Sequence, residues 1–170
     1  MNVYDFGGTM QIDTVQLEWQ KDANIIIGQS HFIKTVEDIA EIMASTNPGI
    51  HYGLAFNEAS GPCLVRTEGN DPELIKDAET CALKTGAGHT FYLILGSGGY
   101  PINVLDRIKM CQEVCRIFCA TANPVQVIVA RTEQGAGILG IIDGYSPKGV
   151  EQESDKTDRK AMLRRFGYKF

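Results

Sequence analysis

Apolar residues along the chain recur with two different periods, which predicts a protein built from both strands and helices. Alternation of apolar and polar residues, or a short apolar run, is typical of a strand. On this basis we expect strands at 15–19, 25–27, 52–56, 63–66, 90–95, 125–131 and 137–143. Apolar residues three or four positions apart are typical of an amphipathic helix. That spacing predicts helices from 35 to the Asn47-Pro48-Gly49 stop, at 72–84, at 101–120 and at 155–166.

Residues at the ends of these segments refine the fold. Asp71 followed by Pro72 is a strong helix start, and Gly86 is a typical helix end. The first two strands flank a polar turn at 21–24, which favours a hairpin. The 90–95 strand carries no charge and is expected at the centre of a sheet. Apolar strands mixed with helices predict an α/β protein, a three-layer α/β/α sandwich around a mixed β-sheet, in a single domain spanning 1–170.

Composition narrows the function classes. The formal net charge is −5, which argues against a general nucleic-acid binder. No apolar run approaches the roughly 20 residues of a membrane span, and residues 1–5 have no basic or apolar leader. We therefore expect a cytoplasmic protein with no membrane partner. The five cysteines are odd in number, which argues against a disulfide framework. Residues 1–10 show little pattern and predict a loose arm.

The stretch Gly86-Ala87-Gly88-His89-Thr90-Phe91 is the main candidate for chemistry. Its glycines let the backbone take positive φ and let another group come close. A histidine held there, between a helix end and a central strand, can act as nucleophile, acid or base. The alternative is a glycine helix cap followed by a histidine that only satisfies a backbone carbonyl. The spacing alone does not separate these two interpretations.

Two other glycine-rich stretches are weaker candidates. Gly135 to Gly140 fits G-x-G-x-x-G, but the residues after it are strand-like, so a hairpin turn is expected rather than a dinucleotide site. Gly96 to Gly99 precedes the expected 101–120 helix, whose N-terminus would favour an anion, although an ordinary connection explains it equally well. His89 and Gly96 lie at opposite ends of one strand, about 20 Å apart. They cannot bind the same phosphate within one subunit.

Cysteines and carboxylates complete the candidate set. Cys111, Cys115 and Cys119 recur every four residues on the expected 101–120 helix, and we interpret them as small buried apolar groups with no metal site. The segment 57–61 presents the Glu58 carboxylate, the Ser60 hydroxyl and the Gly61 backbone together, unless it is simply a polar turn. Other loop carboxylates of interest are Asp71, at the helix start, and Asp143, which is either a turn former or a site residue.

Several blocks, taken together, resemble one known family. They are Phe56-Asn57-Glu58-Ala59-Ser60-Gly61-Pro62, Gly86-Ala87-Gly88-His89-Thr90-Phe91, Pro101-Ile102-Asn103-Val104-Leu105, Ala120-Thr121-Ala122-Asn123-Pro124, and Gly137-Ile138-Leu139-Gly140 with Asp143-Gly144. In this order, over nearly the whole chain, they resemble the small prokaryotic adenosine-specific kinases.

The resemblance implies a three-layer fold, assembly into trimers or hexamers, and binding of adenosine or AMP. It also implies phosphoryl transfer through a phosphohistidine, which would be His89. The matched blocks supply a ligand-binding set, Glu58, Ser60, Gly61, Gly86, Gly88, Asn123 and Asp143. Glu58 or Asp143 would orient the imidazole. No resident cofactor is implied, and the phosphate donor is left unspecified.

Two residues depart from the family pattern. Ala136 stands where arginine is common, and Asn57 where cysteine is common. If that arginine holds phosphate in relatives, this chain binds phosphate less well. The alternative function is therefore a nucleoside-binding or sensing module without turnover.

We expect the ligand site to lie at or near a subunit interface.

Overall fold

The computed structural model describes residues 8–170, and the expected arm at 1–10 lies mostly outside them. Within this range the chain forms two sheets, four α-helices and one short 3-10 turn. The elements in chain order are β1 (Gln11–Gln16), β2 (Asn24–Ser30), α1 (Thr35–Thr46), β3 (Tyr52–Asn57), β4 (Val65–Gly69), α2 (Pro72–Thr85), β5 (Thr90–Leu95), η1 (Pro101–Asn103), α3 (Leu105–Lys109), β6 (Val114–Thr121), β7 (Val125–Arg131), β8 (Ala136–Asp143) and α4 (Glu153–Arg165).

The larger sheet has the strand order β4-β3-β5-β2-β6. Its central strand, β5, is the uncharged 90–95 segment, and all six of its residues are buried. The sequence-based expectation for this strand is confirmed. The strand pairs of this sheet are all antiparallel, so the expected mixed sheet is corrected to an antiparallel one. Each crossover helix skips one strand: α1 joins β2 to β3 with β5 between them, and α2 joins β4 to β5 with β3 between them, so the paired neighbours are antiparallel.

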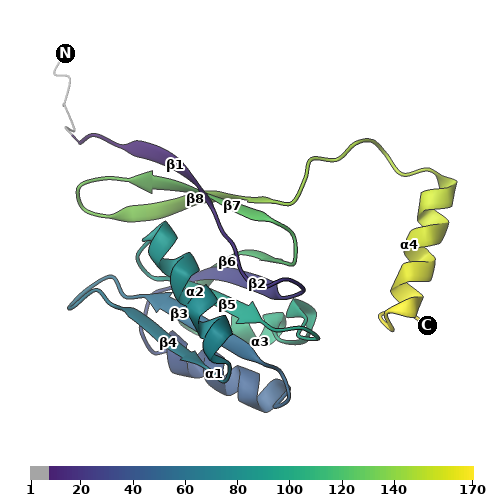
Figure 1. The fold of residues 1–170 in the computed structure, drawn as a ribbon, viewed down its shortest axis with the longest axis horizontal. Helices are drawn as coiled ribbons and strands as arrows, with labels where there is room; N and C mark the ends of the chain where they lie inside the picture. Colours follow the sequence, from purple (N-terminus) through teal and green to yellow (C-terminus); the bar gives the residue numbers. More distant parts are fainter. Residues whose placement is uncertain (1–7) are drawn as a thin grey trace.

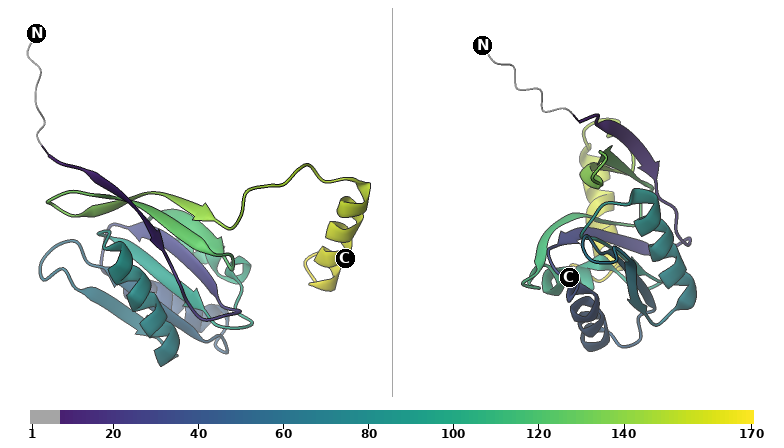
Figure 2. Two further views of the ribbon diagram at one scale, coloured as in Figure 1. Left: turned by 45° about the horizontal axis from the view of Figure 1, so that its top comes forward. Right: turned by 90° about the vertical axis from the view of Figure 1, so that its left-hand side faces the viewer.

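Two hydrophobic cores, one on each face of this sheet, produce three layers (Figure 1). Helices α1 and α3 cover one face, where Ile39 and Ile108 pack with Phe91 of β5. On the other face, α2 and the small sheet β1-β7-β8 pack against Tyr92, and Val127 belongs to this second core. Figure 2 shows the small sheet lying across the larger one from a second direction. The α/β class and the layered arrangement are as expected, with a small sheet sharing the third layer.

The expected helix at 101–120 is wrong beyond residue 109. The chain instead forms η1, the five-residue α3, and then the edge strand β6. Two β-bulges interrupt the pairing of β6 with β2, and they leave Cys115 and Phe118 without partners in the register. Each bulge adds one residue, so Val114, Ile117 and Ala120 reach the same core at a spacing of three. A bulged strand thus imitates the period of a helix.

The expected hairpin between the first two strands is also wrong. Strand β1 begins and ends earlier than the predicted 15–19 segment, and it pairs with β7 in the small sheet. Strand β2 pairs with β5 and β6 in the larger one. Leu17, just after β1, is buried in the core between the two sheets. The segment that joins the strands therefore passes between layers instead of turning within one.

Helix α2 has the ends that its sequence predicts. The Asp71 carboxylate accepts hydrogen bonds from the backbone N–H groups of Glu73 and Leu74, at 3.1 and 3.3 Å. Gly86 closes the helix in the left-handed conformation, with φ 63°, and its N–H donates to the carbonyl of Ala82.

Helix α4 lies apart from the rest of the chain. Figure 1 and the left view of Figure 2 show an extended segment after β8 that leads to this helix. None of its residues is buried, although it exposes apolar side chains near its end, including Met162 and Phe166. The predicted 155–166 helix is confirmed, with slightly earlier bounds. Among the residues described, no helix combines the length and the apolar character that a membrane crossing requires.

The side-chain amide of Asn57 ties three elements together. Asn57 ends β3 and is almost fully buried. Its Nδ2 group donates to the carbonyls of Ala82 in α2 and Ala87 in the glycine stretch, both at 3.0 Å, and lies 3.3 Å from the hydroxyl of Thr90 in β5. The Ala82 carbonyl also accepts from the Gly86 N–H, and the Ala87 carbonyl from the Thr90 hydroxyl, so the amide adds a second hydrogen bond to each and joins the three segments.

Replacement of Asn57 by alanine should destabilise the protein by about 1–3 kcal/mol, because the buried hydrogen bonds that join β3 to α2 and to the glycine stretch are lost. Denaturant unfolding measures this change. The matched control is Asn103→Ala, at an exposed position in η1, which should change stability by less than about 0.5 kcal/mol. Equal effects of the two substitutions would contradict the role assigned to Asn57.

Candidate functional site

A cleft of about 590 Å³ opens at one edge of the larger sheet. Its walls come from the loop after β3, the end of α2, the glycine stretch, and the turn between β7 and β8. The volume lies within the range of small-molecule sites. Three of the residues predicted from the sequence line it, Glu58, Gly86 and Gly88.

Two glycine-rich stretches meet at this cleft. Ala87 and Ala136 form a parallel β-bridge, which joins the 86–88 stretch to the turn at 135–137. On the opposite side a side chain at Gly88 would come within 3.0 Å of Ala59, so the loop after β3 packs directly on the glycine. The lack of a side chain at Gly88 therefore lets this loop approach, whereas side chains at Gly135 and Gly137 would meet open space. The close approach is a structural reason for glycine at position 88 that holds with or without a ligand.

Glu58 is held at the cleft by two neighbours. Its carboxylate accepts a hydrogen bond from the Leu64 backbone N–H at 3.1 Å and from Arg66 Nη2 at 3.1 and 3.3 Å. The backbone hydrogen bond from Leu64, followed by the contact with Arg66, lowers the pKa of Glu58 below its usual value. The Nε group of Arg66 is buried and has no partner among the described residues. Arg66 itself does not line the cleft; it lines a separate hollow beside α1, together with Phe32 and Lys34.

His89 lies at the same edge, but its ring is not part of the cleft wall. Its backbone adopts φ 61°, which is uncommon for a residue with a side chain. The His89 N–H donates to the carbonyl of Asn57 at 2.7 Å, and the His89 carbonyl accepts from Ser30 at 2.9 Å. The ring stacks on Phe56, with centroids 5.9 Å apart. Phe56 belongs to the core under α1, whereas the cleft opens on the other face of the sheet.

Asn123 and Asp143 lie elsewhere. Asp143 Oδ1 accepts hydrogen bonds from Asn123 Nδ2 and from the Thr121 hydroxyl, each at 2.9 Å. Asp143 ends β8, whereas Ala136 at the cleft begins it. The two residues are the ends of an eight-residue strand and lie about 23 Å apart. Within one chain, therefore, this pair is remote from the cleft, and both expected imidazole partners of His89 have other partners here.

The remaining sequence candidates divide in the same way. Ser60 and Gly61 lie on the loop after β3, outside the lining of the cleft, and Gly61 adopts φ 64° as a turn residue. Asp71 is the cap of α2. The Gly96 stretch connects β5 to η1, so the long helix whose N-terminus would have held an anion does not exist. An anion site there is no longer supported.

Sequence reasoning missed three residues near the site. Cys63 is an exposed thiol in the cleft wall with φ 51°. Arg66 emerges only because β4 pairs with β3, which places it directly opposite Phe56. Arg131 lies opposite Ala136 in the β7–β8 ladder, and its Nη1 is 3.4 Å from where a side chain on Gly86 would lie. These positions depend on strand register, which local sequence does not show.

Comparisons with known proteins cover nearly the whole chain. The crystal structure of the PH1918 protein from Pyrococcus horikoshii OT3 is 41% identical in sequence and superposes with a TM-score of 0.90. The alignment covers 95% of this chain and 99% of that one. Among curated proteins no match was found. The model of the family described as adenosine specific kinase matches residues 15–169, and the chain belongs to that family.

Proposed function

We propose that the cleft binds adenosine or AMP. The observation that carries this proposal is the convergence of Glu58, Gly86 and Gly88 in one cavity of nucleoside-compatible size. These residues come from separate blocks of a chain whose family is named for adenosine. The cleft also exposes two large apolar side chains, Leu64 at 51% and Leu83 at 69% exposure. Exposed apolar groups in a cleft are suited to contact an aromatic ring.

The polar groups of the cleft suit the rest of a nucleotide. In our proposal adenine packs against Leu64 and Leu83, and the Glu58 carboxylate accepts hydrogen bonds from ribose hydroxyls. The guanidinium group of Arg131, whose Nη1 lies close to Gly86 and whose Nε pairs with Asp13, attracts the phosphate. Arg131 would then supply charge close to the position where Ala136 replaces the family's arginine.

We further propose that the protein transfers a phosphoryl group to adenosine through His89. The neutral imidazole attacks the terminal phosphorus of a phosphoanhydride donor, whose bridging P–O bond breaks as the P–N bond forms. The ribose hydroxyl then attacks this phosphorus, releases the imidazole and loses its proton to solvent. Arg66 lies beside the same Phe56 on which His89 stacks, and it can stabilise the charge on the transferring group.

A second candidate function, binding without turnover, is favoured by one observation. The ring of His89 lies over Phe56, on the face of the sheet away from the cleft. A nucleoside in the cleft reaches the imidazole only if its 5′ end passes the sheet edge at Gly88. A binding or sensing module needs no such approach.

The His89→Asn variant separates the two functions, because asparagine tolerates positive φ and lacks the imidazole. If His89 carries phosphate, AMP formation from adenosine and ATP falls by at least about a hundredfold, while calorimetry shows adenosine binding within a few-fold of wild type. His51→Gln is the control, since His51 is exposed and pairs with Asp71 away from the cleft. Undiminished turnover in the His89→Asn variant would show that His89 takes no part in the mechanism. Binding by the wild type without product favours the module.

Cys63 provides a test of the cleft that is independent of catalysis. Cys63 and Cys115 are exposed, whereas burial raises the pKa of Cys81 and Cys119 to about 12. Near pH 8 the two buried thiols are therefore protonated and unreactive. We expect adenosine to slow alkylation of Cys63 several-fold while Cys115, outside the cleft, reacts unchanged; mass spectrometry of the labelled peptides measures both. Equal rates at Cys63 with and without saturating adenosine would contradict this location of the site.

We also propose that the protein is a symmetric homo-oligomer, a trimer or hexamer. Helix α4 exposes apolar residues and has no buried residue in its own chain. The small sheet exposes Ile12, Leu139 and Ile142. Packing of α4 on the small sheet of a neighbouring copy would cover both surfaces. An interface there would also allow Asp143 to approach a neighbour's cleft.

Light scattering at micromolar concentration tests the assembly. The double variant Leu139→Asp, Ile142→Asp should reduce the mass to that of one chain, because two charges cannot be buried in an apolar interface. Met110→Asp is the control, at an apolar position 83% exposed beyond α3, and should leave the mass unchanged. If the wild-type protein is a monomer at this concentration and still binds adenosine, the proposed interface is contradicted.

A further inference from the structure

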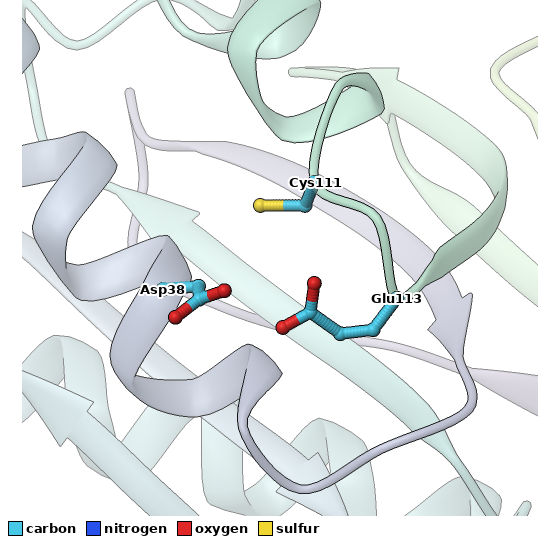
Figure 3. A group of neighbouring side chains, drawn as sticks. All are labelled: Asp38, Cys111 and Glu113. Carbon is cyan, nitrogen blue, oxygen red and sulfur yellow. The ribbon is translucent and has the colours of Figure 1, made fainter.

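Three potential metal ligands meet on the α1 side of the larger sheet, outside the cleft. Asp38 comes from the first turn of α1, and Cys111 and Glu113 come from the segment between α3 and β6. One ligand atom from each lies within 4.8 Å of the others. Figure 3 shows the thiol and the two carboxylates around a common space.

The carboxylate of Glu113 lacks the partners that a buried charge requires. Its side chain is only 2% exposed. Oε1 lies 3.5 Å from Lys34 Nζ, and Oε2 has no hydrogen-bond partner among the described residues. Figure 3 shows this carboxylate directed toward Asp38. Buried carboxylates are normally paired or coordinate a metal ion, so the free oxygen points to a missing ligand.

The backbone holds the three residues in place. The Val114 N–H donates to the carbonyl of Cys111 at 3.0 Å, which forms a tight turn that begins at Cys111 and has Glu113 as its third residue. The carbonyl of Glu113 accepts from the His31 N–H at 3.0 Å, which joins this turn to the segment before α1. The turn and the helix therefore present their ligands to each other without rearrangement of the chain.

We propose that Asp38, Cys111 and Glu113 bind a divalent transition-metal ion of the zinc type. One thiolate and two carboxylates are a donor set that excludes calcium and magnesium, which prefer oxygen alone. Tetrahedral coordination places ligand atoms roughly 3.5 Å apart. Side-chain rotations that move each ligand atom by about 1 Å therefore complete the site. Water takes the fourth position, and the Cys111 thiol releases its proton to solvent when the metal–sulfur bond forms.

Lys34 occupies the entrance of this site. Its ammonium contacts the carboxylate of Asp38 and lies within ion-pair distance of Glu113. The side chain is 45% exposed, so it can turn toward solvent when a metal ion enters. The structure thus contains a cation at the mouth of the site that a metal would displace. The sequence-based expectation of no metal site rested on a cysteine-bearing helix that does not form.

Cobalt is the probe for this site, because Co²⁺ bound to a thiolate absorbs in the near ultraviolet. Full-length protein is stripped with chelator and titrated with Co²⁺, and Zn²⁺ is then added. We expect one equivalent of thiolate-to-cobalt absorption that Zn²⁺ removes, and a higher melting temperature with Zn²⁺. Cys111→Ser and Glu113→Gln should each abolish the absorption. Cys115→Ser, at an exposed cysteine two residues beyond Glu113, should retain it.

The Lys34→Met variant tests the site by a gain of binding. Removal of the competing ammonium should tighten Co²⁺ binding by roughly tenfold, which corresponds to about 1.4 kcal/mol. A damaged fold would weaken binding instead, and the melting curve of each metal-free variant verifies folding. Absence of the absorption in the wild type overturns the proposal, as does absorption that survives in Cys111→Ser.

Discussion

The structure depends on the burial of β5 on both faces. This strand has six consecutive buried residues and no charge, so each side of it must be covered by apolar side chains. Helices α1 and α3 cover one side, and α2 with the small sheet covers the other. The layer formed by α2 and the small sheet places the β7–β8 turn against the glycine stretch before β5. The cleft is thus a consequence of how the central strand is covered.

Features that depend on a few neighbouring residues were predictable from the sequence. The Asp71 cap, the left-handed Gly86 and the central position of the uncharged strand all follow from local chemistry. The strand β6 did not, because its two bulges change the spacing of inward-facing residues from two to three. The partner of β1 was equally hidden, since the nearest strand in sequence is not its neighbour in space. Which strands pair across long sequence separations depends on how all the layers pack together, and local sequence does not show this.

The same distinction applies to the candidate site. Glu58, Gly86 and Gly88 converge because their blocks lie at one edge of the larger sheet. Asp143 belongs to a block that begins at this edge, but its strand carries it to the opposite end. Strand register alone brings Arg66 to Glu58 and Arg131 to Gly86. A motif therefore predicts which segments form the site. It predicts less reliably which side chains of those segments come together.

Backbone strain gives an independent indication of which side chains are needed. Among the described residues three non-glycine positions have positive φ, Asp22, Cys63 and His89. Asp22 lies in a turn, where aspartate tolerates this conformation. Histidine is also found in this conformation more often than most residues, whereas for Cys63 the left-handed conformation costs about 1–2 kcal/mol relative to glycine. Both lie at the sheet edge that carries the cleft, one in its wall and one beside it. Positive φ at Cys63 and His89 fits the binding role proposed for this edge, because strained backbone is concentrated at functional sites.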